Sequence, residues 1–471
     1  MDFESPQPKK KNNAFLPIIL SLVLVIGIWL GFVLSKRINN DSDFSQNNSS
    51  SSNDKINSLL EYIEYQYVDT IDKKDLVEKT VTSMLQSLDP HSSYIAASEF
   101  AATNEPLEGN FDGIGVEFNI IKDTIRVITP IEGGPSEKIG IRAGDKIIKV
   151  DGKNVASIEI TNKQVFEKLR GESGTIVRVS ILRRGINKML EFKITRDAIP
   201  LYSLDAAYMV KPDIGYIKIS KFAATTYQEY LKAFNDLNSQ GMKKLILDLR
   251  GNPGGYLNAA VDISDEFLTN GLQIVYTQGK ANPKKTYKAT EHGSFENNPL
   301  VVLIDEGSAS ASEIVSGAIQ DWDRGVIVGR RSFGKGLVQR PIPLPDGSMV
   351  RLTVQKYYTP AGRCIQKPYE KGLEDYEMDY LKRLKNGEFF HADSIKFSEK
   401  DKYETRLTKR TVYGGGGIMP DILVEPSSYA IKKGFDLKME TVKKIIAEKI
   451  DNAKLYFEVL GNNWYVSNVS F

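Results

Sequence analysis

The sequence predicts a multidomain α/β protein, and three observations support this fold class. From Ile214 onward, apolar runs of strand length alternate with stretches of helical periodicity, which is the order of a largely parallel sheet covered by helices. Residues 111–197 have the pattern of short strands with one helix, which predicts a smaller domain inserted before the α/β core. Residues 14–34 carry no charge, which predicts a membrane-spanning helix ahead of both domains.

Composition limits the classes of function that remain open. A formal net charge of +2 over 471 residues gives no basis for nucleic-acid binding. The single cysteine, Cys364, excludes an intramolecular disulfide and a thiolate metal cluster. The three histidines, His91, His292 and His391, lack the spacing of a metal site, and His91 in its turn is most simply a loop residue. We therefore expect neither a metal nor a cofactor, and a lysine rather than a histidine as any general base.

Residues 14–35 predict a transmembrane helix, because about 20 apolar residues suffice to span a bilayer. A cleaved signal peptide is the alternative, but its apolar region is usually about 7–15 residues and no Ala-x-Ala site follows here. The positive charge is heavier before the span than after it, so residues 1–13 are expected in the cytoplasm. The rest of the chain then lies outside, on the periplasmic or extracellular face of a bacterial inner membrane.

The predicted span is followed by a polar stretch and then by a stretch of helical periodicity. Residues 36–53 are rich in Asn and Ser with almost nothing to bury, which predicts a flexible linker. In residues 54–110, apolar side chains recur at helical spacing, which predicts an N-terminal helical region with two amphipathic helices ending at Pro90.

Residues 111–197 resemble a PDZ domain. The resemblance rests on the Ala-Gly-Asp-x-Ile-x-x-Val-Asp-Gly pattern of residues 143–152 and on a Gly-x-Gly loop before a strand. It implies that the loop's backbone amides bind the terminal carboxylate of a peptide, which adds as a strand. The loop residues are Gly113, Ile114, Gly115 and Val116. Arg170, after the predicted helix 162–169, is a candidate for coupling this domain to the active site, although a surface arginine is the commoner case.

Residues 198–426 contain the predicted α/β core and its most informative stretch. Strands at 215–220, 245–249 and 272–277 alternate with helices at 227–238 and 259–268. A further strand, 300–304, runs into a turn and then into a helix that opens with Ser310 and Glu313, a Ser-x-x-Glu capping box. Most serines at such positions only cap a helix, but this one presents a hydroxyl beside a run of small residues that lets another backbone approach.

Two more features accompany Ser310. Lys335 lies between two glycines, and Gln339 shares its face because a spacing of four repeats in a strand and in a helix alike. A second glycine turn, residues 248–255, follows the strand at 245–247, and amides freed at such a turn can bind an oxyanion. The sequence therefore contains candidates for a nucleophile, a general base and an oxyanion hole.

Together these motifs resemble the C-terminal processing peptidases, the tail-specific serine proteases. The motifs are Ser-Ala-Ser-Ala-Ser-Glu, Phe-Gly-Lys-Gly with its Gln, and Asp-Leu-Arg-x-Asn-Pro-Gly-Gly, and the resemblance covers residues 56–424. It implies a crotonase-like core of ββα units. It also implies Ser310 as nucleophile, Lys335 as general base and Gln339 as the residue that orients the lysine. The oxyanion donors fall on the amides of Ala311 and Gly254.

The chain departs from shorter family members after the core. Residues 369–411 are charge-rich and delay the Gly-Ile-x-Pro-Asp motif to residues 417–421, so we interpret them as an inserted surface excursion. Residues 427–471 predict a helical tail that packs on the body or on a second copy of the chain, which leaves a homodimer open.

The function that the sequence predicts is that of a membrane-anchored, extracytoplasmic serine endopeptidase with a Ser-Lys dyad. Its substrates are proteins or peptides with free C-termini, which the PDZ domain recognises and the core cleaves nearby. One alternative is a crotonase-like acyl-transfer enzyme, for which Lys335 would be superfluous. The other is an inactive PDZ adaptor, against which the intact Ser310, Lys335 and Gln339 argue. Cleavage of an unstructured protein separates the three.

Overall fold

The computed structural model describes residues 21–30, 52–391, 394–396 and 398–424. Residues 1–13, most of the predicted span 14–35, nearly all of the predicted linker and the tail 427–471 lie outside these ranges. Residues 21–30 are helical, and within the described ranges no helix combines the length and the apolarity that crossing a membrane requires. The chain forms two compact units, Met1–Val77 and Glu78–Phe471.

Helices dominate the first part of the chain, as the apolar spacing predicts. Helix α2 spans Ser52–Gln66 and α3 spans Lys73–Gln86. A short strand, β1 (Ser93–Ile95), and a further helix, α4 (Phe100–Glu108), follow. Strand β1 has no periodic signal in the sequence, because it is only three residues long.

The segment that resembles a PDZ domain is a sheet with its own apolar core. Its strand order is β3-β4-β5-β7-β8, with β6 paired to β5. The strands are β3 (Val116–Ile120), β4 (Ile125–Pro130), β5 (Lys146–Val150), β6 (Lys153–Asn154), β7 (Ile176–Leu182) and β8 (Leu190–Thr195). Helices α5 (Pro135–Lys138) and α6 (Asn162–Leu169) accompany it. Buried Ile125, Ile147 and Val177 are part of its core, and α6 has the predicted bounds.

The two ends of this segment are joined to each other. Strand β2 (Asn110–Gly113) pairs antiparallel with β9 (Asp197–Pro200). The chain therefore enters and leaves the small domain through one two-stranded ribbon, as expected for a domain inserted into another.

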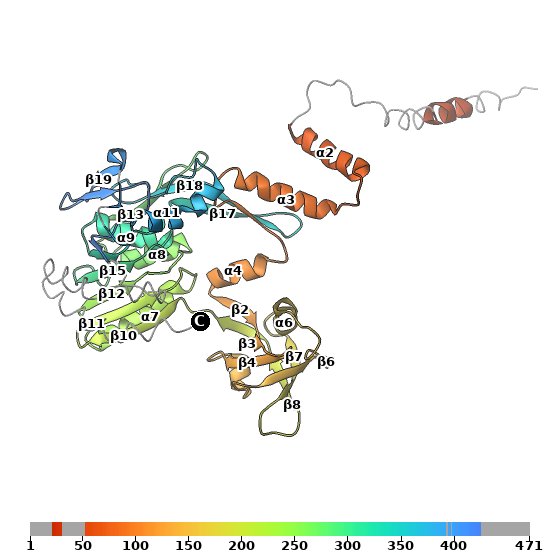
Figure 1. Cartoon of the computed structure of the whole chain (residues 1–471), viewed down its shortest axis with the longest axis horizontal. Coiled ribbons are helices and arrows are strands. Elements are labelled where there is room, and N and C mark those ends of the chain that lie inside the picture. Colours follow the sequence, from red (N-terminus) through yellow and green to blue (C-terminus); the bar gives the residue numbers. More distant parts are fainter. Residues whose placement is uncertain (1–20, 31–51, 392–393, 397, 425–471) are drawn as a thin grey trace, which may run out of the picture. The chain divides into compact units, whose positions relative to one another are not determined.

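The core contains a six-stranded sheet in the order β10-β11-β12-β15-β16-β21, of which Figure 1 labels β10, β11, β12 and β15. Its strands are β10 (Leu204–Lys211), β11 (Ile214–Ile219), β12 (Lys244–Asp248), β15 (Leu300–Ile304), β16 (Val326–Gly329) and β21 (Ile422–Leu423). All pairs from β11 to β21 are parallel. Helices α7 (Thr226–Ser239), α8 (Leu257–Asp265) and α9 (Ala311–Asp321) contribute to the same apolar cluster as β11, β12, β15 and β16. The prediction of a largely parallel sheet is confirmed.

A second sheet holds the strand predicted at 272–277, which pairs with none of the strands of the parallel sheet. This strand, β13 (Gln273–Gln278), pairs antiparallel with β14 (Lys285–Lys288) and with β18 (Met349–Tyr358). Strand β17 (Leu337–Pro343) pairs with β18 as a hairpin. Strand β1 pairs with the same β18, with Tyr94 opposite Val350. This pairing brings the turn at His91 close to the strand that carries Gln339.

The residues from 369 onward fold against the core in part. They form α10 (Leu373–Glu377), α11 (Asp379–Lys385), β19 (Lys402–Glu404) and β20 (Thr411–Tyr413). Tyr376, Arg383, Glu388 and Phe389 are buried, which a surface excursion would not require. The first half of this segment is therefore integral to the packed structure.

Candidate active site

Ser310 lies in a strained turn between a buried strand and a helix. Strand β15 ends at Ile304 and α9 begins at Ala311, and Ser310 has φ 53° and ψ −109°. A residue other than glycine in such a conformation costs about 1–3 kcal/mol and is found mainly at functional sites. The turn is fixed by Ser308, whose Oγ donates to the carbonyl of Leu249 at 2.8 Å. A strained serine in a sharp turn between a strand and a helix is the arrangement of a nucleophile elbow.

Glu313 joins the backbone of the serine to the backbone of the lysine segment. Its buried carboxylate accepts hydrogen bonds from the amides of Ser310 (2.8 Å) and Lys335 (2.9 Å) through Oε2. Its Oε1 accepts from the Gly334 amide (2.7 Å) and from Ser332 Oγ (2.5 Å). Burial raises the pKa of Glu313, while these four donors oppose the rise. The hydrogen bond from the Ser310 amide to Glu313, which the predicted capping box requires, is thus present. The same carboxylate also binds the lysine segment.

Tyr357 makes a second connection between the same two segments. Its hydroxyl lies 2.7 Å from the carbonyl oxygen of Lys335 and 3.0 Å from that of Ser310. The ring is buried. A hydroxyl has one proton, so it donates to these two carbonyls in alternation or in a shared bond. Ser310 and Lys335 are therefore held together through two independent residues.

Lys335 has the environment of a lysine that can act as a base. Burial lowers the pKa of Lys335 and the charge of Arg351 lowers it further, while Glu313 and Asp89 oppose the shift. Its Nζ donates to Gln339 Oε1 at 3.1 Å. Among the described residues no hydrogen bond joins Nζ to Ser310 Oγ. Such contacts are often long before substrate binds.

The glycines around Lys335 are required by the close approach of other backbone. A Cβ on Gly336 would lie 2.8 Å from the Gln366 amide nitrogen, and one on Gly334 would lie 3.1 Å from that of Gly417. Gly334 also has φ +90°. Gln366 in turn accepts the Gly336 amide through Oε1 at 2.8 Å. The glycine pair therefore lets the lysine segment pass between its neighbours.

The predicted oxyanion donors lie side by side. A Cβ on Gly254, whose φ is +98°, would be 2.7 Å from Ser310 Cβ and 2.9 Å from the Ala311 amide nitrogen. The Gly254 amide already donates to Asn252 Oδ1 at 2.8 Å. It can serve as a donor only by exchanging this neutral acceptor for the oxyanion, which is the stronger acceptor. Within the turn, Arg250 forms an ion pair with the buried carboxylate of Asp248.

The four predicted residues of the carboxylate-binding loop are also together. Gly113 ends β2, Val116 begins β3, and Ile114 and Gly115 lie between them. The carbonyls of Ile114 and Gly115 accept the amides of Ser136 and Ile131 at 3.1 and 3.0 Å. The amides of Ile114 and Gly115 have no hydrogen-bond partner within the described ranges. The loop thus lies at the end of the edge strand β3, with free donors.

Arg170 follows α6 and contacts residues outside the small domain's sheet. It forms an ion pair with Glu105 of α4, and its guanidinium lies 4.9 Å and 4.7 Å from the ring centroids of Phe111 and Phe166. Its side chain is 29% exposed. These contacts are those of a partly buried residue at a junction between elements.

Sequence reasoning missed several residues that hold the lysine segment. His91, interpreted as a loop residue, accepts a hydrogen bond from Gln339 Nε2 through its carbonyl oxygen. Burial and the charge of Lys335 lower the pKa of His91 to about 4. Tyr357, Gln366 and Tyr376 were not singled out. Their roles depend on strand pairing and on the packing of the residues after 369, for which the sequence contains no local signal.

Comparison with known proteins identifies the family of the chain. The chain matches the models of peptidase family S41 over residues 213–375, the PDZ domain over 126–183 and the activating protease CtpB N-terminal domain over 29–99. A carboxy-terminal-processing protease of Bartonella bacilliformis is 37% identical over 350 residues, covering 73% of this chain and 80% of that protein.

Two proteins of Bacillus subtilis are similar over comparable lengths. The carboxy-terminal processing protease CtpB is 34% identical over 354 residues, covering 74% of this chain and 72% of that protein. The carboxy-terminal processing protease CtpA is 34% identical over 405 residues, covering 83% and 84% respectively. The chain therefore belongs to the C-terminal processing peptidases, serine peptidases of family S41 with a PDZ domain.

Proposed function

We propose that the chain is a membrane-anchored endopeptidase outside the cytoplasm, in which Ser310 is the nucleophile and Lys335 the general base. The observation that supports this most strongly is the pair of connections, through Glu313 and Tyr357, that hold the backbones of Ser310 and Lys335 together. A purely structural serine or lysine would need neither. The parallel sheet of the core is in keeping with a crotonase-like description.

The chemistry follows from these positions. Neutral Lys335 takes the hydroxyl proton as Ser310 Oγ attacks the peptide carbonyl, and Gln339 Oε1 accepts one Nζ–H and so orients the amine. The amides of Ala311 and Gly254 stabilise the oxyanion. Protonated Lys335 then gives its proton to the leaving amine. A water molecule, deprotonated by Lys335 in turn, hydrolyses the acyl-enzyme and restores Ser310.

The direct test uses the whole chain in detergent with an unstructured protein as substrate. The wild type should produce fragments that mass spectrometry resolves, and Ser310→Ala should produce none. Cleavage by Ser310→Ala at the wild-type rate would contradict the assignment of the nucleophile.

The PDZ domain is proposed to recognise the free C-terminus of the substrate. The unpartnered amides of Ile114 and Gly115 are suited to a carboxylate, and edge strand β3 is open to an added strand. A peptide with a free carboxylate should therefore bind Ser310→Ala about tenfold or more tighter than its amidated form, since hydrogen bonds to a charged group contribute about 1.5–3 kcal/mol. Fluorescence anisotropy measures both affinities, and the wild type should cleave the free peptide faster.

This test changes the peptide rather than the protein, because the loop tolerates little change in its residues. A Cβ on Gly115, whose φ is +70°, would lie 2.9 Å from Ile199 Cδ1, so a variant there would disturb packing as well as recognition. Equal affinity for free and amidated peptides would show that this domain does not recognise tails.

Residues 14–35 are proposed to anchor the protein. A reporter fused after Asn53 should be active only outside the cytoplasm, and one fused after Asn13 only inside, because the apolar run between them is long enough to span a bilayer. Washing membranes at alkaline pH should leave the protein in the pellet. A mature N-terminus near Asn39 would instead show cleavage and contradict the anchor.

A further inference from the structure

We infer that Tyr376, in the segment inserted after residue 369, is a positioning residue for the lysine base, acting through His91 and Gln339. The inference rests on the proposed Ser310–Lys335 dyad and gives the inserted segment a role in it. It concerns a residue that does not itself touch the reacting atoms.

A continuous series of contacts leads from Tyr376 to the amine. The hydroxyl of Tyr376 lies 2.7 Å from Nε2 of His91. The carbonyl oxygen of His91 accepts a hydrogen bond from Gln339 Nε2. Gln339 Oε1 then accepts from Lys335 Nζ at 3.1 Å. Anchoring the His91 ring therefore restrains the residue whose carbonyl holds Gln339.

The His91 carbonyl decides which end of the Gln339 amide faces the lysine. The two ends of a carboxamide have nearly the same shape but opposite hydrogen-bonding character. A carbonyl can only accept, so it selects the NH2 end and leaves the oxygen for Lys335 Nζ. If the carbonyl moved away, the NH2 end could turn toward Nζ and donate to the lone pair of the neutral amine, which would then not be available for the serine proton.

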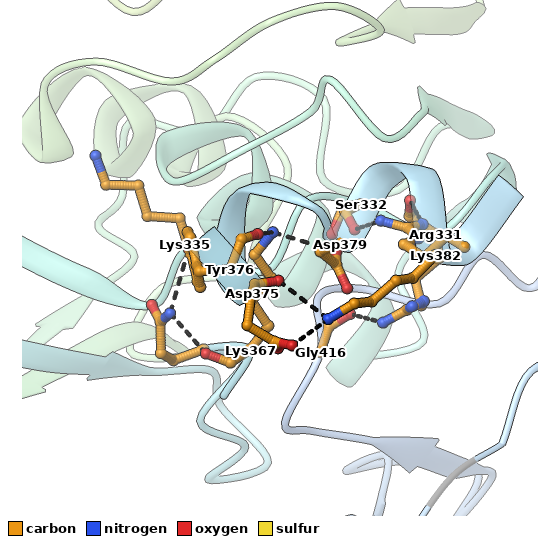
Figure 2. Close-up of polar contacts among 12 residues, drawn as sticks. Arg331, Ser332, Lys335, Lys367, Asp375, Tyr376, Asp379, Lys382 and Gly416 are labelled. Atoms are coloured by element: carbon orange, nitrogen blue, oxygen red, sulfur yellow. Dashed lines mark hydrogen bonds and ion pairs between the residues drawn. The ribbon is translucent and has the colours of Figure 1, made fainter. Parts of the chain in front are cut away.

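The ring of Tyr376 is held in place independently of its hydroxyl. Lys367 Nζ lies 4.1 Å from the ring centroid of Tyr376 and 4.0 Å from that of Phe333, and it is paired with Asp379 at 3.2 Å. Figure 2 shows Lys367, Tyr376 and Asp379, with Lys382 directed at Asp375 beside them. Removing only the hydroxyl should therefore leave the packing intact.

The rest of the inserted segment supports the same stretch of chain. Arg383 of α11 donates to the carbonyls of Ser332 (3.1 Å) and Arg331 (2.6 Å), and Glu388 binds the side chains of Arg331 and Arg383. Residues 331 and 332 immediately precede the lysine segment. The segment after 369 thus contacts the surroundings of the base in two places: Tyr376 contacts His91, and Arg383 of α11 contacts residues 331 and 332.

The contact between Tyr376 and His91 stays neutral over the working pH range. Burial lowers the pKa of His91 to about 4 and raises that of Tyr376, so neither group changes charge near neutrality. The groups that face His91 are Lys335, Asp89 and Lys367. A change of pH profile in a Tyr376 variant therefore reports on the lysine rather than on this pair.

The test is Tyr376→Phe, with Tyr380→Phe as matched control. Tyr380 is in α11 of the same segment, with a ring that is 49% exposed. We expect kcat to fall about tenfold for Tyr376→Phe with KM unchanged, since general-base catalysis as a whole contributes about 10²–10⁴-fold and only its orientation is affected. The limb of the kcat profile that reports Lys335 should move to lower pH, because the charged amine loses an acceptor. The control should match the wild type in both respects.

A double-mutant cycle separates positioning from a general structural effect. In the Gln339→Met background, Tyr376→Phe should cause no further fall in kcat, because its effect passes through the Gln339 amide. Independent, multiplying losses would overturn the inference, as would wild-type kcat and pH profile in Tyr376→Phe. Full activity of Lys335→Ala would instead overturn the dyad itself. If Lys335→Ala is inactive and Tyr376→Phe is unaffected, the dyad stands and only the role of Tyr376 is contradicted.

Discussion

Lys335→Ala should lose cleavage as completely as Ser310→Ala, and the double variant should be no worse than either single one. A nucleophile and its base act as a unit, so removing one member forfeits the contribution of both. We expect a fall of at least about 10³-fold in kcat/KM for each variant, with residual activity from the oxyanion donors and substrate binding alone. Initial rates of peptide cleavage by the full chain measure all three.

The pH dependence should carry the signature of a buried lysine. Burial disfavours the charged amine and lowers the pKa of Lys335, and only the neutral amine can accept the serine proton. Activity should therefore rise with pH through a limb that lies below the ordinary lysine value of about 10.4. Lys335→Arg, which stays protonated, should be inactive at every pH tested.

Stability provides the control for these variants. The pKa of Lys335 is lower in the folded chain than in the unfolded chain, so the unfolded chain binds more protons. The free energy of unfolding should therefore decrease as pH falls below the pKa that Lys335 has in the unfolded chain. Lys335→Met keeps most of the volume without the buried amine, so its free energy of unfolding near neutrality should equal or exceed that of the wild type. Near-normal cleavage by Lys335→Ala together with loss in His91→Ala would indicate a histidine base instead.

The local motifs of the active site could be predicted because each is encoded in a short stretch. The turn before α9, the glycines beside Lys335 and the glycine turn before Tyr256 follow from backbone requirements that few residues meet. The strand, turn and helix around Ser310 were therefore predicted from sequence. Lys335 and Gln339 were given no definite element, and the structure has Lys335 just before β17 and Gln339 within it. The occupied amide of Gly254 was not foreseen, because it depends on the rotamer of Asn252.

The connections between motifs could not be predicted because they depend on pairing between distant strands. The three residues of β1 are too few for a periodic signal, yet their pairing with β18 brings His91 to Gln339. In the same way, β13 has an ordinary strand pattern, and nothing in it distinguishes the antiparallel sheet from the parallel one. The packing of Tyr376 comes from a charge-rich stretch whose composition suggested solvent exposure.

Glu313→Gln should be the most damaging conservative change outside the dyad. The carboxylate accepts two donors on each oxygen, and an amide offers one oxygen and one NH2 group. At least one buried backbone N–H must then face another donor. Leaving such a group unsatisfied costs about 1–3 kcal/mol, so we expect the free energy of unfolding to fall by about 3 kcal/mol.

The loss of cleavage should exceed what this destabilisation explains. The amides that lose their acceptor belong to Ser310, Gly334 or Lys335, and a displacement of about 1 Å between reacting groups costs about 10²-fold in rate. We therefore expect kcat to fall at least about 100-fold, measured well below the melting temperature of the variant. Glu266→Gln is the matched control, because Glu266 is a buried carboxylate with its own donors, Tyr227 and Ser294, away from the site. It should keep kcat within about twofold, since its donors do not carry the reacting groups. It should also lose less stability, because the Tyr227 hydroxyl can turn to accept from the new NH2 group. Equal losses of kcat in both variants would show that Glu313 supports the fold alone.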